Sequence, residues 1–458
     1  CLHVGRPTPS PPDTVTVAPF LAESHMARLK TGVLLACLLA RADALSAARS
    51  KAGAKHAGRT CRSASIPFDE FLRKFKKGYE PNSPEYHKRR VLFEERVGHI
   101  DQHNCNEELS WTAGVNHLTD WTDAELSSLR GYRGRRAQDH GSLSSMDYYS
   151  SLNSRPSRRA YPDNWDWFHL QAIREPRDQG QCGSCWAFAS EQVLRAHAEI
   201  KGWPSNFSVS QIIACTPNPH ECGGTGGCNG ATVELAFDYV LRQGLVAEED
   251  LPYPVGGGEA SCPVELQSAP AQADGILDVD GSEVHMLHGL ADPRTARGRS
   301  IGMIGWSKFP ENRVDHLVRA LVEEGPIAIA VAAGRDWNWY TRGIMLPSGC
   351  DSKFVISHAV VLFGYGASTK RKFWHVKNSW GSDWGEKGNL RLLRLDSEET
   401  YCGWDNEPEV GSGCKGGPPR VWACGSCGIL YDTAMPHFAP FSKKDQEDHR
   451  MSSIPDAA

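Results

Sequence analysis

One octet of the chain reads Gln179-Gly180-Gln181-Cys182-Gly183-Ser184-Cys185-Trp186. Residues 187–200, which follow it, are apolar at helical intervals, and Gly202 is suited to end a helix. This pattern predicts a buried helix with Cys185 in its first turn. A thiol with a pKa of about 8.5 is a poor nucleophile at acidic pH, but a helix N-terminus and a neighbouring imidazolium lower that pKa to ~3.5–7.5. Cys185 is therefore a candidate nucleophile.

Three other interpretations of Cys182 and Cys185 compete with this one. The pair forms a C-x-x-C motif, which occurs in redox sites and as half of a zinc site. The second C-x-x-C, at Cys424 and Cys427, lies much farther away than the ~15–20 residues of a zinc ribbon. A thioredoxin-like site requires a surrounding βαβ pattern, which we do not find. The third interpretation makes both residues half-cystines, which suits Cys182 better than Cys185.

A candidate base lies at the start of a predicted strand. His358 precedes residues 359–366, a β-branched and aromatic run that ends in glycines. A second strand over residues 373–377 runs into Asn378, and a short polar turn joins the two strands into a hairpin. The hairpin brings Asn378 beside His358, where an amide oxygen would fix the tautomer and orientation of the ring. Trp380 is placed to shield that hydrogen bond from water.

A long helix is predicted from Ser83, which can cap it, with Pro84 at the first helical position. Six side chains repeat at steps of three or four and so share one stripe of this helix. An ordinary amphipathic helix has no need for charged and amide groups on the stripe that carries its apolar residues. The stripe consists of Glu85, Arg89, Phe93, Arg96, Ile100 and Asn104.

These segments resemble the motifs of papain-like cysteine proteases of the cathepsin L-like subfamily. The octet ending in Trp186 is similar to the family's nucleophile segment, and the segments at His358 and Asn378 are similar to its His and Asn motifs. The helix stripe resembles the propeptide signature Glu-Arg-Phe-Asn-Ile-Asn, with Arg96 in place of the first Asn. Residues 114–120 resemble a second propeptide motif, with Leu118 in place of Phe. The resemblance covers roughly residues 85–440.

The resemblance implies an α+β architecture, namely the papain-like two-domain fold with a helical left domain and a β-barrel-like right domain, preceded by a helical propeptide. It also implies catalytic roles: Cys185 as nucleophile, His358 as its acid–base partner and Asn378 as the residue that orients His358. Gln179 would donate its amide to the oxyanion, alongside the backbone N–H of Cys185. The implied activity is that of a cysteine-type endopeptidase, made as a zymogen, that hydrolyses peptide bonds through a thioester acyl-enzyme.

Substrate-binding residues are implied by the same resemblance. A substrate-binding strand is expected at residues 227–231, with Gly230 facing the peptide and Ala231 in place of the usual second Gly. Trp380 is expected beside the substrate. Asp432 is expected at the base of the second subsite, where it would accept Arg as well as Leu or Phe; the alternative is an ordinary surface acid. The other expected residues of that subsite are Thr232, Val233, Ala330 and Ile356.

Eleven cysteines lie beyond residue 160, and removing one nucleophile leaves an even number, as expected of an oxidised secreted domain. Parity does not identify which cysteine keeps its thiol. The resemblance implies three disulfides, Cys182–Cys228, Cys215–Cys262 and Cys350–Cys427. Two further disulfides are expected, with the pairing left open, among Cys222, Cys402, Cys414 and Cys424.

The 458 residues divide into five predicted segments. Residues 1–25 are interpreted as upstream sequence and 26–44 as a signal peptide, because a basic start, an apolar run and small residues follow in that order. Residues 45–159 form the inhibitory propeptide, 160–440 the catalytic domain and 441–458 a disordered tail. Two insertions are expected, near 279–300 and at 402–426. Asn206 begins an N-glycosylation sequon, which matters only in a secreted chain.

Composition narrows the function classes. The net charge of −5 argues against nucleic-acid binding, and no apolar run approaches the ~20 residues of a membrane span. We find no motif for a metal or a cofactor and expect neither. The expected partners are peptide or protein substrates and the chain's own propeptide as an intramolecular inhibitor. A monomer in the secretory pathway, lysosomal, vacuolar or extracellular, is expected. The alternatives are a papain-family exopeptidase, with an insertion plugging the cleft, and an inactive binding relative.

Overall fold

The structure is a computed structural model that describes residues 66–132, 161–259, 261–263, 266 and 297–442. By its internal contacts the chain divides into Cys1–Cys61 and Arg62–Ala458, and all described residues belong to the second unit. The predicted upstream segment and signal peptide therefore lie outside the described residues. Most of the predicted tail and most of the predicted insertion near 279–300 lie outside them as well.

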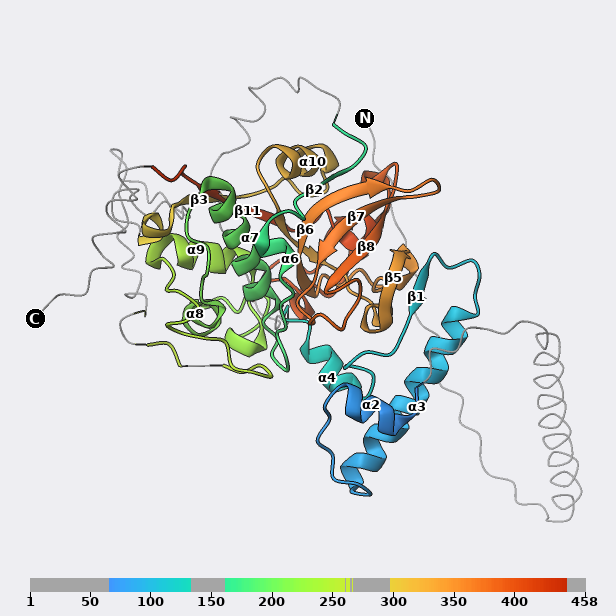
Figure 1. Cartoon of the computed structure of the whole chain (residues 1–458). Coiled ribbons are helices and arrows are strands. Elements are labelled where there is room, and N and C mark those ends of the chain that lie inside the picture. Colours follow the sequence, from blue (N-terminus) through green and yellow to red (C-terminus); the bar gives the residue numbers. More distant parts are fainter. Residues whose placement is uncertain (1–65, 133–160, 260, 264–265, 267–296, 443–458) are drawn as a thin grey trace, which may run out of the picture. The chain divides into compact units, whose positions relative to one another are not determined.

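The α-helices of the described residues are short, apart from two long ones that carry the motifs singled out above (Figure 1). They are α2 (Phe68–Lys74), α3 (Pro84–Asn104), α4 (Asp123–Ser128), α6 (Gln171–Arg174), α7 (Cys185–Lys201), α8 (Val209–Cys215), α9 (Val233–Gln243) and α10 (Val314–Glu323). The 3-10 helices are η1 (Gly227–Asn229), η3 (Arg297–Ile301), η4 (Arg335–Trp339), η5 (Pro347–Gly349), η6 (Glu398–Thr400), η7 (Pro408–Val410) and η8 (Ser426–Gly428).

The strands form one nine-stranded sheet and one two-stranded sheet. The order along the large sheet is β1-β5-β8-β7-β6-β4-β11-β3, with β2 paired to β6, and β10 pairs with β9 in the small sheet. The strands are β1 (Trp111–Ala113), β2 (Trp165–Asp166), β3 (Met303–Lys308), β4 (Ile327–Val331), β5 (Tyr340–Met345), β6 (His358–Ala367), β7 (Lys372–Lys377), β8 (Asn389–Arg394), β9 (Cys402–Asp405), β10 (Val421–Cys424) and β11 (Thr433–Phe438).

Helix α3 begins where the sequence predicts, and helix α7 both begins and ends where it predicts. The Ser83 side chain accepts a hydrogen bond from the Tyr86 amide, and Pro84 is the first residue of α3. Helix α7 begins at Cys185 and ends at Gly202, whose φ of 85° is a left-handed conformation that favours glycine. Fourteen of its residues, from Cys185 to Ala198, are buried, so this helix is the centre of the helical half of the core.

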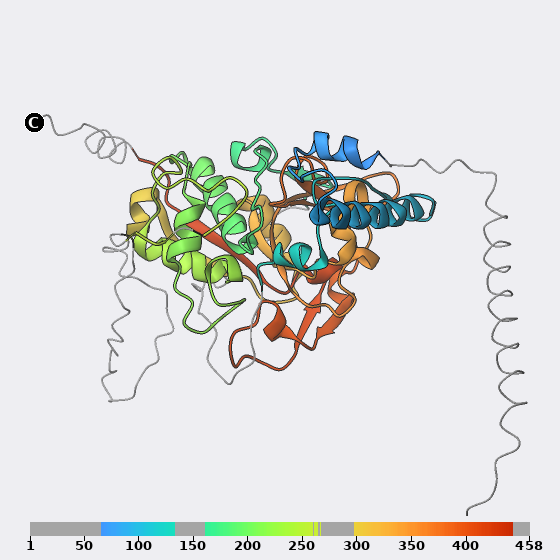
Figure 2. The ribbon, with the colours of Figure 1, turned by 90° about the horizontal axis from the view of Figure 1, so that it is seen from below.

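The predicted hairpin is also present. Strand β6 pairs antiparallel with β7, and β4 pairs with the other edge of β6, so β6 lies inside the sheet with nearly every residue buried. Figures 1 and 2 show the helices α7, α8 and α9 grouped together, apart from the strands β5, β7 and β8. The first residue of α7 and the first residue of β6 meet between these two groups, as the contacts below show.

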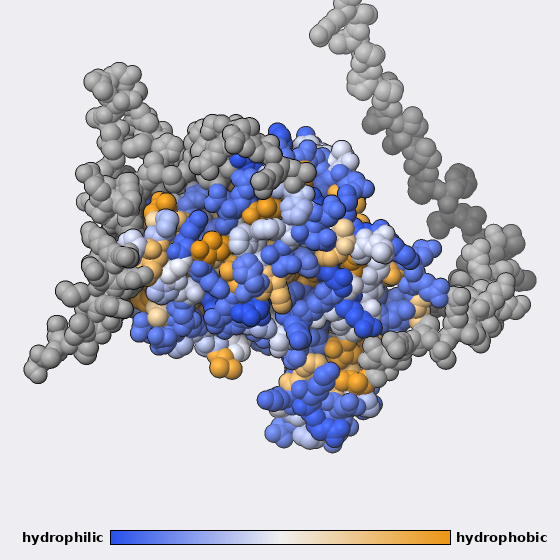
Figure 3. Space-filling view, turned by 45° about the horizontal axis from the view of Figure 1, so that its top comes forward, coloured by the Kyte–Doolittle hydropathy of each residue, from blue (hydrophilic) through white to orange (hydrophobic). Residues whose placement is uncertain are grey.

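The N-terminal segment of the described chain adds its own strand to the large sheet. Strand β1 pairs antiparallel with β5, with Trp111 opposite Gly343. Residues that lie more than 220 positions apart in the sequence are thereby joined by backbone hydrogen bonds, as in strand addition by a bound peptide. On the face shown in Figure 3 the surface is mostly hydrophilic, and hydrophobic side chains occur there in small separate patches.

Candidate active site

The Cys185 thiol lies at the start of α7, as the sequence predicts. Cys185 is the first helical residue, it is fully buried, and it keeps its thiol, whereas the other cysteines of the described residues are in disulfides. The preceding loop is fixed by the Cys182–Cys228 disulfide and by a hydrogen bond of 3.0 Å from the Gly183 N–H to the Cys228 carbonyl. The redox and zinc interpretations of Cys182 with Cys185 are therefore wrong for this structure.

His358 is the first residue of β6, and the residue that follows it contacts this thiol. The backbone N–H of Ala359, the residue after His358, points at Cys185 Sγ from 3.4 Å. His358 Nε2 lies 2.8 Å from Asn378 Oδ1, and that oxygen also accepts the Ser379 N–H at 2.9 Å. The Ser379 N–H identifies this atom of Asn378 as the amide oxygen, which can only accept hydrogen bonds. His358 Nε2 must therefore be the donor and carry the proton. Nδ1 is then left as the basic nitrogen, and within the described residues it makes no hydrogen bond.

Aromatic rings enclose the His358–Asn378 hydrogen bond. The ring centroids of His358 and Trp380 are 4.9 Å apart, and Trp337 approaches His358 edge-on at 6.2 Å. All four side chains are buried. Burial lowers the pKa of His358 to about 3; the hydrogen bond that His358 donates to Asn378 opposes this shift, and the charge of Arg130 adds to it. With residues 66–132 in place, the imidazole is therefore neutral at physiological pH.

The Gln179 side chain, the predicted oxyanion donor, is fixed by three hydrogen bonds. Its amide Nε2 donates to the Leu129 carbonyl at 2.9 Å and to the Cys182 carbonyl at 2.7 Å, while its Oε1 accepts the Ser379 hydroxyl at 2.6 Å. The Ser379 bond fixes the direction of the amide. A carbonyl from the N-terminal segment therefore occupies the position in which a reacting carbonyl oxygen would be held.

Residues 129–132 run directly across the thiol. The Gly131 N–H donates to Cys185 Sγ at 3.1 Å, and the Tyr132 N–H donates to the Ser357 carbonyl at 3.2 Å. A Cβ on Gly131 would lie 2.2 Å from the Gly183 carbonyl oxygen and 3.0 Å from Sγ, so only glycine permits this approach. The predicted Gly230 lies on the same path, because a Cβ built there would meet the Gly131 carbonyl.

The polar side chains of the α3 stripe bind neighbouring elements of the N-terminal segment. Both Arg89 amino groups bind the Glu125 carboxylate at 2.6 Å, and Arg96 binds Asp123 at 2.7 Å. Asn104 exchanges two hydrogen bonds of 3.0 Å with the backbone of Ala113. The stripe thereby holds α4 and β1 against α3, and these two elements lead the chain onto the thiol.

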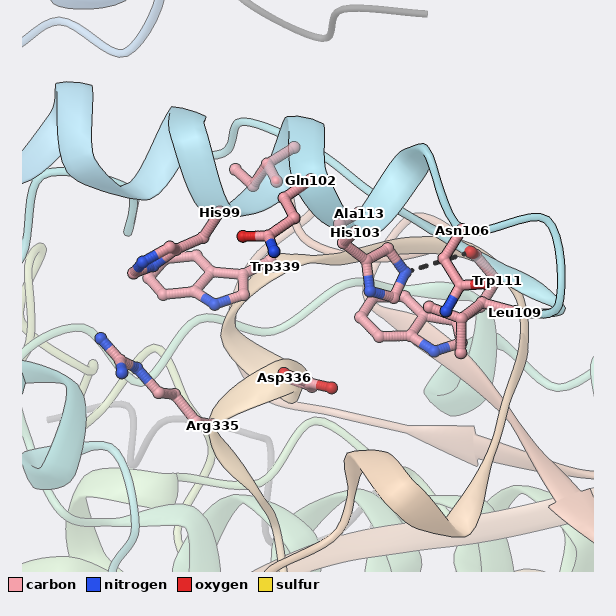
Figure 4. A pocket seen from close by; sticks show the side chains of 11 residues that line it. His99, Gln102, His103, Asn106, Leu109, Trp111, Ala113, Arg335, Asp336 and Trp339 are labelled. Carbon is pink, nitrogen blue, oxygen red and sulfur yellow. Dashed lines mark hydrogen bonds between the residues drawn. The ribbon is translucent and has the colours of Figure 1, made fainter. Parts of the chain in front are cut away.

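A cavity of about 530 Å³ lies between α3, β1 and η4 (Figure 4). The His103 ring packs against Trp111 with centroids 3.8 Å apart, and Asp336 and Arg335 project from η4 on the other side. Burial lowers the pKa of His103 and raises that of Asp336. The N-terminal segment is therefore packed less closely here than over the thiol.

Four predicted substrate-binding residues share one hydrophobic cluster with Tyr132: Ala231 from the predicted strand, and Val233, Ala330 and Ile356 from the predicted second subsite. Asp432 is buried, so the alternative of a surface acid is wrong. The predicted strand conformation at 227–231 is wrong for residues 227–229, and substrate binding there stays a prediction. Residues Gly227–Asn229 form η1, because Gly226, Gly227 and Gly230 have φ of 98°, 56° and 100°, which a strand does not accommodate.

Other residues of this site carried no signal in the sequence. Lys308 Nζ lies 2.9 Å from Asp432 Oδ1 and 3.0 Å from Glu234 Oε1. Lys308 ends a strand of alternating pattern and reads as an ordinary edge lysine. Arg130 and Tyr132 lie outside the two propeptide motifs in the sequence. Only Gly131, between them, indicates that the backbone passes close to another part of the chain.

The structure contains the three disulfides implied by the resemblance and resolves the open pairings as Cys222–Cys414 and Cys402–Cys424. Asn206 is exposed and donates to Glu249 at 3.2 Å, a contact that leaves the side chain at the surface. Within the described residues no cluster of metal-binding side chains occurs, and no helix among them is long and apolar enough to cross a membrane.

This fold and this arrangement of thiol, imidazole and amide are suited to a hydrolase that attacks carbonyl carbon with sulfur. The comparison with known families agrees with that class. Residues 161–412 match the Papain family cysteine protease, and residues 68–126 match the Cathepsin propeptide inhibitor domain. The chain belongs to the papain family of cysteine proteases, and it carries a cathepsin-type propeptide.

Curated relatives support the subfamily. A cathepsin L-like proteinase of Fasciola hepatica is 31% identical over 73% of this chain and 90% of its own length. Procathepsin L of Mus musculus is 28% identical over 71% of this chain and 85% of its own length. These matches confirm the predicted cathepsin L-like family and the predicted enzyme class, a cysteine-type endopeptidase.

A solved structure supports the fold. The digestive procathepsin L2 proteinase of Tenebrio molitor larval midgut superimposes with a TM-score of 0.59 at 24% identity, over 81% of this chain and 98% of its own. The predicted α+β papain-like fold with a preceding propeptide is thereby confirmed.

Proposed function

We propose that the mature enzyme is an endopeptidase that works through a Cys185 thiolate and a His358 imidazolium. The observation that carries this proposal is the meeting of the α7 and β6 N-termini. There, Cys185 Sγ lies 3.4 Å from the amide of Ala359 while Asn378 holds the far nitrogen of His358 at 2.8 Å. The α7 N-terminus and the imidazolium both stabilise the thiolate.

Each reaction step then has a named group. The thiolate attacks the peptide carbonyl carbon, and the resulting oxyanion accepts hydrogen bonds from Gln179 Nε2 and the Cys185 N–H. His358 gives its proton to the leaving amine as the C–N bond breaks, leaving a thioester. His358 next takes a proton from water, the hydroxide attacks the thioester, and the acid product leaves as the thiolate re-forms.

The propeptide inhibits by binding in the active-site cleft with its chain running opposite to the direction of a substrate. Gln179, the oxyanion donor, binds the Leu129 carbonyl, and the chain continues through Gly131 over the thiol to Tyr132 in the second subsite. A substrate presents its second-subsite residue before the scissile bond, whereas the propeptide presents Tyr132 after it. The bound chain is therefore misaligned for cleavage at this site.

We further propose residues 26–44 as the signal peptide, 45–159 as the propeptide and 160–440 as the catalytic domain. The number of disulfides supports an oxidising compartment, and we assign the protein to the secretory pathway with a lysosomal, vacuolar or extracellular destination. Exposed Asn206 is the proposed glycan site, for which a mass decrease on enzymatic deglycosylation is the test.

The mechanism is tested with a thiol-directed epoxide and an internally quenched peptide blocked at both ends. We expect the mature wild-type protein to label and to cleave the blocked peptide, and Cys185→Ser to do neither. Cleavage restricted to peptides with a free terminus would favour the exopeptidase alternative. Equal labelling of Cys185→Ser would remove Cys185 from its assigned role.

A further inference from the structure

Three charged side chains from different elements converge at the end of the second subsite. Lys308, the last residue of β3, lies between Glu234 on α9 and Asp432, which directly precedes β11. Its Nζ is 3.0 Å from Glu234 Oε1 and 2.9 Å from Asp432 Oδ1. The side chains of both acids are at least nine-tenths buried, so solvent screens these pairs little.

The backbone holds Asp432 in this position. The Ala330 N–H donates to the Asp432 carbonyl at 2.8 Å, and strand β11 continues from there between β4 and β3. Strand β3, which carries Lys308, pairs directly with β11, with Lys308 opposite Ala434. One antiparallel pair of strands therefore fixes the backbone positions of both Lys308 and Asp432.

The propeptide indicates what the subsite accepts. Tyr132 is buried in the cluster that includes Ala231, Val233 and Ala330. Burial raises the pKa of Tyr132 well above its usual value, so the side chain is neutral. The propeptide thus fills the subsite with an uncharged aromatic residue, although two carboxylates lie nearby.

Space alone does not exclude a longer side chain. A cavity of about 270 Å³ is lined by Thr232, which the sequence places in the second subsite, and by the charged side chains of Glu234, Lys308 and Asp432. Its far wall comes from residues around Cys414, which the Cys222–Cys414 disulfide ties to the helical half. An arginine side chain has room to extend into this cavity, so charge decides whether it binds.

We propose that Lys308 determines substrate specificity by forming an ion pair with Asp432. The second subsite then binds an uncharged side chain of about the size of tyrosine and rejects arginine. This inference rests on the proposed function, because it concerns the same cleft. An incoming guanidinium would meet the Lys308 ammonium in a partly buried site, and like charges there strongly disfavour binding. Burial and the neighbouring Glu234 also raise the pKa of Asp432 to about 7, which leaves the carboxyl less able to attract a second cation.

The test compares Lys308→Met, which keeps the length of the side chain and removes its charge, with the wild type. Fluorogenic dipeptides with Tyr, Leu or Arg before the terminal Arg measure kcat/KM at the second subsite. We expect the wild type to cleave the Arg substrate at least ~10² more slowly than the Tyr substrate. We expect Lys308→Met to raise the Arg-to-Tyr ratio by at least about 10-fold, which corresponds to about 1.4 kcal/mol.

Two further variants make the test specific. Lys353→Met removes an exposed lysine that pairs with Glu407 outside the subsite, and its Arg-to-Tyr ratio should stay as in the wild type. The double variant Lys308→Met/Asp432→Asn should lose the gain, because the uncovered carboxylate is removed. Asp432→Asn alone should change the ratio less than about 3-fold, and this variant keeps the test valid if Lys308→Met fails to fold.

Some results would overturn the inference. A wild type that cleaves the Arg substrate as fast as the Tyr substrate contradicts it, as does an unchanged ratio in active Lys308→Met. A large loss of Arg cleavage in Asp432→Asn would mean that Asp432 receives the substrate arginine directly. Failure of the wild type to cleave any substrate or to label with the epoxide would instead refute the proposed function, and this inference with it.

Discussion

At the scale of single residues, the structure keeps His358, the proposed acid–base group, neutral. Burial lowers the pKa of His358 to about 3, and Arg130 of the propeptide adds a positive charge that disfavours the imidazolium. Arg130 is itself held by a hydrogen bond of 3.2 Å to the Gly334 carbonyl. In the proposed mechanism, the N-terminal segment therefore also suppresses the charge state of His358 that the thiolate requires. We expect its removal to expose the ring and to let the pKa of His358 return towards its usual range.

Asn378→Ala tests the orienting role. Loss of the amide oxygen frees the ring to rotate and to change tautomer, so kcat of the mature enzyme should fall by about two orders of magnitude, the low end of what a positioned acid–base group contributes. KM should change little, because Asn378 is buried behind His358. Steady-state kinetics with a blocked peptide measure both constants, and a kcat equal to that of the wild type would exclude this role.

At the scale of elements, the propeptide depends on one glycine. Gly131→Ala places a Cβ within 2.2 Å of the Gly183 carbonyl oxygen, so the backbone has to lift from the thiol. Overpacking of this kind costs about 1–3 kcal/mol, which corresponds to an inhibitory contact weakened by roughly 5- to 150-fold. The rate at which the epoxide labels Cys185 in the intact proform should rise accordingly.

Gly98→Ala is the matched control for this prediction. Gly98 lies in α3, and a Cβ there would meet nothing within 4 Å. This substitution should leave the labelling rate of the proform unchanged, and should stabilise α3 slightly because alanine favours a helix. Equal labelling of both variants would mean that the close approach of Gly131 does not restrain the proform.

The Arg89–Glu125 pair predicts how acid loosens the propeptide. Burial alone would raise the pKa of Glu125, but hydrogen bonds from Arg89 and Thr122 lower it to about 2. Because the folded pKa lies below the ordinary value of about 4.5, the stabilisation is complete above that value and is lost as pH falls through about 2.

Glu125→Gln provides the measurement. The difference in melting temperature between wild-type and variant proform should be constant above about pH 5 and shrink towards zero near pH 2. A difference that does not vary over this range would show that the carboxylate charge does not hold α4.

Several helices and strands could be predicted from the sequence alone. The α3 and α7 boundaries follow from Ser83, Pro84 and Gly202, because caps are local signals. The β6–β7 hairpin follows from its apolar pattern. The error at Gly227–Asn229 arose because a strand was transferred from a resemblance, whereas three left-handed glycines make a turn.

Contacts between distant segments were the part that the sequence did not reveal. Lys308 meets Asp432 only because β3 pairs with β11, and a single lysine at a strand end carries no local signal of that pairing. The same holds for Tyr132, whose pocket is assembled from Ala231, Ala330 and Ile356 on separate elements.

At the scale of the whole molecule, the insertion at 402–426 is built into the catalytic domain by disulfides. Strands β9 and β10 form a hairpin closed by Cys402–Cys424, and Cys222–Cys414 joins the middle of the predicted insertion to the loop after α8 across 192 residues of sequence. Two backbone bonds support this contact, from Gly223 N–H to the Gly413 carbonyl and from Lys415 N–H to the His220 carbonyl.

Replacing Cys222 and Cys414 together by Ala should destabilise the mature enzyme by about 2–4 kcal/mol, because the disulfide closes a long loop. Denaturant unfolding of the mature protein measures the change. Replacing Cys402 and Cys424 together, which closes only 22 residues, should cost less. The reverse order would contradict this account of how the insertion is anchored.

The pH dependence of Cys185 alkylation in the mature enzyme tests most directly whether His358 and Cys185 act as an ion pair. We predict that wild-type enzyme reacts rapidly at pH 5, far below the ordinary thiol pKa of about 8.5, and that in His358→Ala the reaction rises only as pH approaches that value. Identical profiles for the two proteins would contradict the ion pair and the mechanism built on it.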